Sequence, residues 1–245
     1  MPNSKLQVKN LKCEYRLNPL GIDVLQPRLS WQLDAAHRGA SQQAFQVVAG
    51  LDAVALLPGN AILWDSGRLD TDQSMHIPYV GPALQSRQRI YWRVRVWDEN
   101  AHPTPWSKTA WFEMGLLDQA DWQAHWIGNT LVGGPRTPVP NPFFRKDFEI
   151  TGEIQSARLY VTSLGIYEAT LNGQRVGEDV FTPGWTDYAQ RVQYQVYDVA
   201  ELLTSGENVL GAILGDGWYC GHVAWEGRQR YGGRPKLLAQ LEITL

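Results

Sequence analysis

Cysteine and long apolar runs are both scarce in this sequence. The two cysteines of the 245-residue chain, Cys13 and Cys220, stand far apart and form no CxxC pair. This spacing excludes zinc ribbons and disulfide scaffolds. No apolar run approaches the ~20 residues that a membrane helix needs, and residues 1–10 lack the apolar stretch of a signal peptide. We therefore expect a soluble, cytoplasmic protein.

An excess of charge of one sign is also lacking. The chain has 22 Lys and Arg against 25 Asp and Glu, so its formal net charge is −3. No basic face dominates at this balance, which leaves nothing obvious for nucleic-acid binding. The histidines are isolated, no glycine-rich phosphate loop follows a strand, and no Gly-x-Ser-x-Gly elbow occurs. These absences disfavour transition-metal, nucleotide and acyl-transfer chemistry.

Aromatic and turn-forming residues are abundant instead. The sequence contains 11 Trp, 10 Tyr, 23 Gly and 14 Pro. Strand-forming aromatic residues between frequent turns favour an all-β protein. Trp-rich β domains are common where sugars bind, because an indole face packs well against C–H bonds. Most tryptophans of such domains nevertheless fill cores and seams.

Residues 1–117 predict a β-sandwich of the fibronectin type III or immunoglobulin-like kind. About seven short strands in this length have the size and rhythm of that fold. The strongest strand covers residues 89–98, where Trp92, Val94 and Val96 point to one face. Two arginines and two aromatic residues share the other face, so we expect arginine to stack on a neighbouring ring there.

Residues 118–142 are expected to link two domains. Trp122 and Trp126 are four positions apart, which suits one helical turn that bridges the domains and buries both indoles. Residues 132–140 are rich in glycine and proline and predict a loop.

Residues 143–245 predict a second β domain, a galactose-binding-like jelly roll. Its strands are expected at residues 143–150, 157–163, 166–171, 192–198, 208–214 and 237–245. Asn172-Gly173 is a strong hairpin signal. The last strand is apolar and carries no guarding charge at its end, so the domain looks truncated. We expect it to be incomplete at its C-terminus and to self-associate through that edge.

Six segments, in this order, resemble the N-terminal part of bacterial α-L-rhamnosidases, which are inverting glycoside hydrolases. They are residues 122–128, 143–148, 165–177, 183–188, 206–210 and 215–219. The resemblance implies that these modules precede a further β domain, an (α/α)6 barrel and a C-terminal β domain. It also implies hydrolysis of terminal α-L-rhamnose by two carboxyl groups that lie in the barrel. The chain would then contain no catalytic residue and be inactive alone.

Two segments supply the candidate sugar-binding residues. A sugar platform needs an exposed ring beside carboxylate or amide groups, and both segments offer them next to turn-forming glycines. The candidates are Trp185, Asp187, Tyr188, Asp216, Trp218 and Tyr219. The competing interpretation is that both segments are packing corners that dock onto later domains, and the residues leave this alternative open.

A calcium site is a further implication of the resemblance, because similar modules in that family can bind rhamnose through calcium. Calcium takes about six to eight oxygen ligands, and Asn172, Asp187 and Asp216 could contribute only part of such a set. The expected partners are rhamnose-containing glycosides and the catalytic and C-terminal domains of a parent enzyme. The alternatives are a free-standing carbohydrate-binding protein and a structural two-domain β protein without a ligand.

Overall fold

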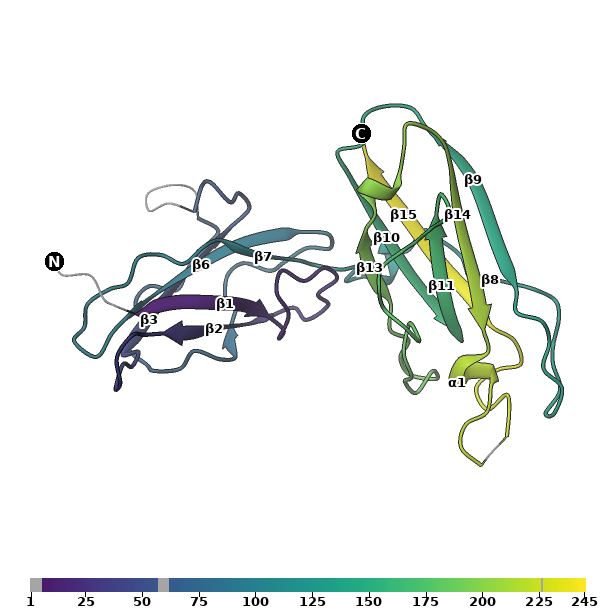
Figure 1. The fold of residues 1–245 in the computed structure, drawn as a ribbon, viewed down its shortest axis with the longest axis horizontal. Helices are drawn as coiled ribbons and strands as arrows, with labels where there is room; N and C mark the ends of the chain where they lie inside the picture. The colour runs from purple at the N-terminus through teal and green to yellow at the C-terminus, as the bar shows by residue number, and fades with distance from the viewer. Residues whose placement is uncertain (1–5, 57–61, 226) are drawn as a thin grey trace. The chain divides into compact units, whose positions relative to one another are not determined.

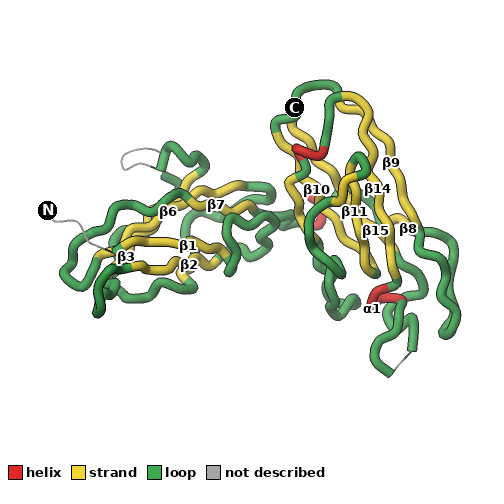
Figure 2. Tube along the Cα trace, viewed as in Figure 1, coloured by secondary structure: helices red, strands yellow, loops and turns green. Residues whose placement is uncertain are grey.

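Strands make up almost all of the regular structure of this chain. The computed structural model describes residues 6–56, 62–225 and 227–245. Helix is confined to short turns between strands (Figure 2). The chain divides into two compact units, Met1–Asp121 and Trp122–Leu245 (Figure 1). The predicted all-β class is confirmed. Within the described residues, the structure has no helix that is long and apolar enough to cross a membrane.

The first unit is a sandwich of two antiparallel sheets. One sheet has the order β1-β2-β5, which are Gln7–Cys13, Arg28–Asp34 and Ile77–Pro78. The other has the order β4-β3-β6-β7, which are Trp64–Asp65, Ala44–Gly50, Arg89–Trp97 and Ala110–Glu113. These strands form the expected immunoglobulin-like architecture.

Strand β6 shows the predicted alternation of buried and half-buried side chains. Trp92, Val94 and Val96 have no exposed surface and lie in the core between the sheets. On the opposite face, the Arg95 guanidinium lies 4.8 Å from the ring centroid of Trp106. Because a cation over an indole face is attracted by the ring quadrupole, the expected stacking stabilises this outer surface.

The second unit packs two four-stranded antiparallel sheets face to face. One has the order β13-β10-β15-β8, which are Gln195–Asp198, Ser156–Leu164, Lys236–Thr244 and Ile127–Gly128. The other has the order β12-β11-β14-β9, which are Gln174–Arg175, Ile166–Leu171, Gly206–Gly215 and Phe143–Ile150. Leu159, Leu171 and Leu214 are fully buried between the sheets. The predicted Asn172-Gly173 hairpin joins β11 to β12.

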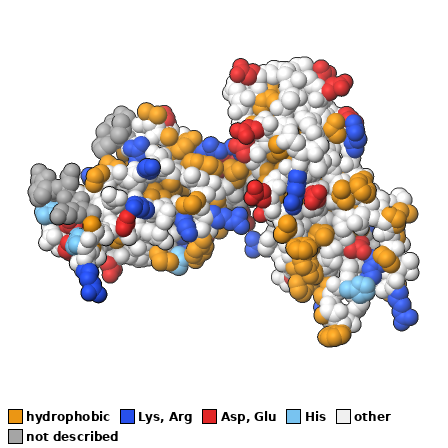
Figure 3. All heavy atoms as spheres, in the orientation of Figure 1, with side chains coloured by type: hydrophobic (Ala, Val, Ile, Leu, Met, Phe, Trp, Pro, Cys, Tyr) orange, Lys and Arg blue, Asp and Glu red, His pale blue; other side chains and the backbone are white. Residues whose placement is uncertain are grey.

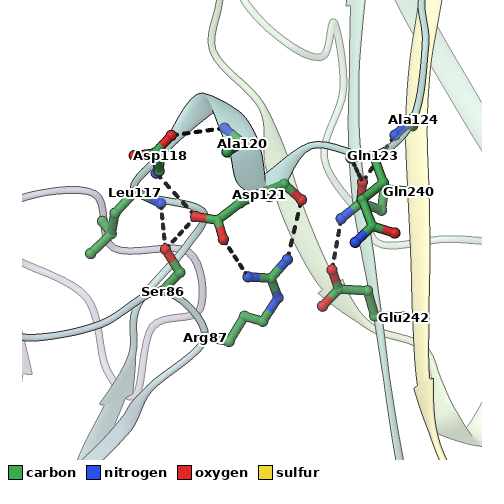
Figure 4. A network of polar contacts seen from close by, with 10 residues as sticks. All are labelled: Ser86, Arg87, Leu117, Asp118, Ala120, Asp121, Gln123, Ala124, Gln240 and Glu242. Carbon is green, nitrogen blue, oxygen red and sulfur yellow. Dashed lines mark hydrogen bonds and ion pairs between the residues drawn. The ribbon is translucent and has the colours of Figure 1, made fainter.

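A 3-10 turn, η1 (Gln119–Asp121), ends the first unit, and one carboxylate holds it in place. Asp121 accepts hydrogen bonds from the Ser86 hydroxyl at 2.5 Å, from Arg87 Nη1 at 2.7 Å and from the Asp118 amide at 3.0 Å (Figure 4). The Ser86 hydroxyl in turn accepts from the Leu117 amide at 2.9 Å. These donors lower the pKa of Asp121 to about 2, with Ser86 and Arg87 as the largest causes.

The helical turn predicted between Trp122 and Trp126 is not formed. Helix ends at Asp121, and residues 122–126 have no regular structure. Trp122 packs edge-on against Tyr160 and Tyr194 of its own unit, with ring centroids 6.4 and 5.4 Å apart. Trp126 is 41% exposed, so the expected burial of both indoles is wrong for Trp126. Spacing of four residues aligns two side chains only when the backbone between them is helical.

Hydrogen bonds fasten the segment after η1 to β15. The side-chain oxygen of Gln240 accepts from the amides of Gln123 and Ala124, at 2.7 and 3.2 Å (Figure 4). Its amide nitrogen donates to Glu242 at 2.7 Å. Gln240 is buried, so these bonds satisfy polar atoms that burial removes from water.

Strand β15 is less open than its sequence indicated. It pairs with β10 along its whole length, from Lys236 to Thr244. On its other side β8 pairs only with Lys236 and Leu237. Within the described part of the chain, residues 238–244 therefore have a neighbouring strand, β10, on one side only. The strand that was predicted to lack a partner is therefore an inner strand at Lys236 and Leu237 and an edge strand at residues 238–244.

Candidate functional site

The two candidate sugar-binding segments meet at one end of the second unit. Trp185 lies in the loop between β12 and β13, and Trp218 lies on α1 (Gly217–Cys220), the single helical turn that follows β14. The two indoles are parallel within 5°, with ring centroids 6.1 Å apart. We call them the indole pair. Phe181 adjoins it, inclined at 64° to Trp218 with a centroid distance of 6.4 Å.

Exposure distinguishes the rings at this end of the unit. Trp185 is 53% exposed and Phe181 is 66% exposed. Hydrophobic side chains gather on this part of the surface, near α1 (Figure 3). Contiguous exposed aromatic surface is uncommon on a soluble domain and marks binding or docking surfaces.

The predicted tyrosines belong to the packing beneath this surface. Tyr188 is 9% exposed and contacts Tyr219 and Tyr231 edge-to-face, with centroid distances of 5.3 and 5.1 Å. Its hydroxyl donates to the Gly184 carbonyl at 3.2 Å. Burial is the main cause that raises the pKa of Tyr188 to about 12. These contacts join the two segments but leave Tyr188 little surface to offer a ligand.

The two predicted carboxylates already have protein partners. The side chain of Asp187 accepts from the Ala189 amide at 3.2 Å and from the Gln190 side chain at 2.9 Å. Asp216 forms an ion pair with Arg228, whose side chain is only 3% exposed. Both carboxylates therefore stabilise local structure beside the indole pair.

The three candidate calcium ligands do not converge. Asn172 follows the end of β11 that pairs with Leu210, whereas Asp216 follows the β14 residue that pairs with Ile166. The two residues lie beyond opposite ends of this strand pair, at least about 16 Å apart at ~3.3 Å per residue. Among the described residues, no group of three or more His, Cys, Asp or Glu could hold a metal ion.

Asn172 has a structural task in the hairpin instead. Its side chain donates to the Leu202 carbonyl and to the Asn208 side chain, at 2.9 and 2.8 Å, and accepts from the Val209 amide at 2.9 Å. Its φ of +51° matches the turn conformation that Asn tolerates.

Three residues of this region escaped the sequence analysis: Phe181, Arg228 and Tyr231. Phe181 directly precedes Thr182-Pro183, and its φ of +56° is rare for a bulky residue. No local sequence pattern predicts a positive φ at Phe181. Arg228 and Tyr231 reach the site through packing between segments distant in sequence, which spacing alone does not reveal.

Fold and site together define a class: a tandem of β-sandwich domains, the first immunoglobulin-like, the second with an aromatic surface at one end. Residues 8–118 match the family model described as Rha78A-like, N-terminal immunoglobulin domain. Residues 152–245 match the alpha-L-rhamnosidase N-terminal domain. The chain belongs to the alpha-L-rhamnosidase family and consists of the N-terminal domains of that family, so the resemblance seen in the sequence is confirmed.

Similar proteins match nearly the whole chain. An alpha-L-rhamnosidase of Formosa agariphila is 37% identical over 93% of this chain and 25% of its own length. The structure of Streptomyces avermitilis alpha-L-rhamnosidase complexed with L-rhamnose has a TM-score of 0.91 at 26% identity, covering 97% of this chain and 39% of that one. That of Dictyoglumus thermophilum alpha-L-rhamnosidase has a TM-score of 0.86 at 34% identity, covering 97% and 27%. The chain spans 24% to 39% of the length of its curated relatives.

Proposed function

We propose that this chain forms the non-catalytic N-terminal part of a longer α-L-rhamnosidase that removes terminal α-L-rhamnose from glycosides. The observation that carries the proposal is the order of the two family matches in this chain, over residues 8–118 and 152–245, together with its similarity to relatives that are much longer. Inverting hydrolysis needs two carboxyl groups roughly 6.5–9.5 Å apart with a water between them. We assign that pair to the catalytic domain of the longer protein.

Turnover of an aryl α-L-rhamnoside tests this proposal. The purified 245-residue chain is expected to release no aryl alcohol, whereas a longer protein that joins it to the catalytic domain is expected to do so. Inactivity of the longer protein on every aryl α-L-rhamnoside would contradict the assignment. Turnover by the short chain that persists after repurification would contradict its non-catalytic role.

The indole pair is proposed to serve domain assembly. The carboxylates next to it already bind Ala189, Gln190 and Arg228, which favours an apolar role for the exposed rings. Such a surface suits an apolar patch of another domain of the same enzyme.

Sugar binding on the indoles is the second candidate, favoured by the 53% exposure of Trp185. Trp185→Ala separates the two: lost stability of the longer enzyme supports docking, and weaker rhamnose binding by this chain supports sugar recognition.

Self-association through β15 is proposed for the chain on its own. Residues 238–244 pair along one edge within the described residues, and an apolar cavity of about 310 Å³ opens between the two sheets beside them. Leu159, Val161 and Ala239 are among its lining residues. An open strand edge beside uncovered apolar surface favours pairing with a second copy.

A further inference from the structure

An open groove of about 380 Å³ lies on the sheet of β11 and β14, and Phe181 both lines it and contacts Trp218 of the indole pair. Neighbouring Tyr167, Ala212 and Leu214 point into the core, so the alternating residues Ile166 and Ile213 face outward. The groove thus occupies the solvent face of the sheet. Its lining residues include Ile166, Glu168, Arg175, Asp179, Phe181 and Ile213.

The floor of the groove is apolar and flat. Ile166 pairs across the strands with Gly215, and a Cβ at Gly215 would lie 2.9 Å from Ile166 Cγ1. The side chain of Ile166 can therefore pack directly over Gly215, in space that a larger residue would fill. The next pair on this face of the sheet is Glu168 with Ile213, which places a carboxylate beside the apolar floor.

The wall of the groove is the loop after β12, and it is held rigidly. The buried Thr182 hydroxyl donates to the Tyr167 carbonyl at 2.9 Å, and the Tyr197 hydroxyl donates to Asp179 Oδ2 at 2.9 Å. Arg175 donates to the Asp179 carbonyl at 2.7 Å. The loop carries Phe181, 66% exposed, in a left-handed conformation that these bonds maintain. A wall fixed in this way loses little entropy when a ligand binds.

Groups of both charges line the groove. Arg175 Nε lies 3.5 Å from Glu168 Oε2, and their side chains are 44% and 53% exposed. Asp179 uses one carboxylate oxygen for Tyr197, which leaves lone pairs on the other for a ligand. Two carboxylates accept from hydroxyl groups and the guanidinium donates to oxygens. Two carboxylates against one guanidinium leave a net charge of −1, so a neutral polyol suits the groove better than an anion.

We infer that this groove binds one neutral pyranose ring, with Phe181 against its C–H face and Glu168, Asp179 and Arg175 on its hydroxyl groups. The volume lies at the small end of ligand pockets, about 300–1,000 Å³, which fits a single sugar. The inference rests on the proposed function only for the choice of L-rhamnose as the first probe.

The test is a titration of the 15N-labelled chain with L-rhamnose, followed by amide NMR. We expect saturable shifts at residues 166–168, 179–181 and 213–215. D-galacturonate is the charged probe, and it should bind more weakly because it faces two carboxylates. Shifts that do not saturate up to about 100 mM, or that centre on Trp185 and Trp218, overturn the inference.

Variants of Phe181 and Asp179, both in the wall of the groove, complete the test. Phe181→Ala and Phe181→Leu should each raise the Kd, the former by at least about tenfold, because they remove the ring face. Asp179→Asn should raise it about threefold or more. Trp225→Ala is the matched control: Trp225 is fully exposed, does not line the groove and should leave the Kd unchanged. Dispersed amide spectra certify folding. An unchanged Kd in a folded Phe181→Leu variant overturns the inference.

The two proposals fail separately. Absent sugar binding by this chain, combined with rhamnosidase activity of the longer protein, rejects the groove and keeps the proposed function. Sugar binding by this chain, combined with inactivity of the longer protein, keeps the groove and rejects the enzyme assignment.

Discussion

The indole of Trp185 lies parallel to the indole of Trp218, at an interplanar angle of 5° and a centroid distance of 6.1 Å. One ring comes from a loop between two short strands and the other from the helical turn α1. Offset stacking of this kind adds stability beyond area burial. The contact therefore holds the loop of residues 176–194 against the end of β14.

The two indoles should contribute unequally to stability. Trp218→Ala removes the ring that both Trp185 and Phe181 contact, so we expect a loss of about 1–3 kcal/mol in the free energy of unfolding. Trp185→Ala should cost less than about 1 kcal/mol, because half of its surface is already in water. Urea unfolding measures both, with the fully exposed Trp225→Ala as control. Equal losses would contradict the prediction.

Trp122 and Trp126 should also behave differently. Trp122→Ala loses contacts with Tyr160 and Tyr194 and should destabilise the second unit by about 1–3 kcal/mol. Trp126→Ala should change stability by less than about 0.5 kcal/mol, since its ring is 41% exposed. Thermal unfolding measures the stability of both variants, and Trp126→Ala serves as the control for Trp122→Ala. The prediction fails if Trp126→Ala costs as much as Trp122→Ala.

The Asp121 carboxylate should make the first unit sensitive to acid. Its pKa is lowered to about 2 by Ser86 and Arg87, so its stabilising effect is present above its ordinary pKa. The effect is lost as the pH falls from about 4 towards 2. Asp121→Asn should therefore cost about 1–2 kcal/mol at pH 7 and progressively less below pH 4.

Chemical unfolding at several pH values checks the Asp121 prediction. Asp70→Asn is the matched control in the same unit, because the Asp70 side chain is 77% exposed and its pair with Arg68 is worth little. A cost of Asp121→Asn that stays constant from pH 7 to pH 2 would show that the carboxylate charge does not stabilise the unit.

The edge of β15 should make the chain self-associate at high concentration. We expect the mass from light scattering to rise with concentration, and the amides of residues 238–244 to exchange more slowly in the associated form. The amides of β6, an inner strand of the first unit, are the control and should not change. A constant monomer mass at high concentration would reject association through this edge.

Local periodicity and turn chemistry predict most of the strands and the class of fold. The alternation around Trp92 predicts its burial, and Asn172-Gly173 predicts its hairpin, from neighbours only a few residues away. The order of motifs was enough to identify the family. Such signals need no knowledge of distant contacts.

Contacts between distant parts of the fold set which of these residues meet and which remain exposed. Trp185 stacks on Trp218, Asp216 pairs with Arg228, and Asn172 stands at the other end of β11 from Asp216. The groove at Phe181 arises because a hydrogen-bonded loop crosses a flat sheet face. Each of these relationships joins residues that lie at least twelve positions apart in the chain. Burial and hydrogen bonding across the sandwich set them, and no local spacing encodes them.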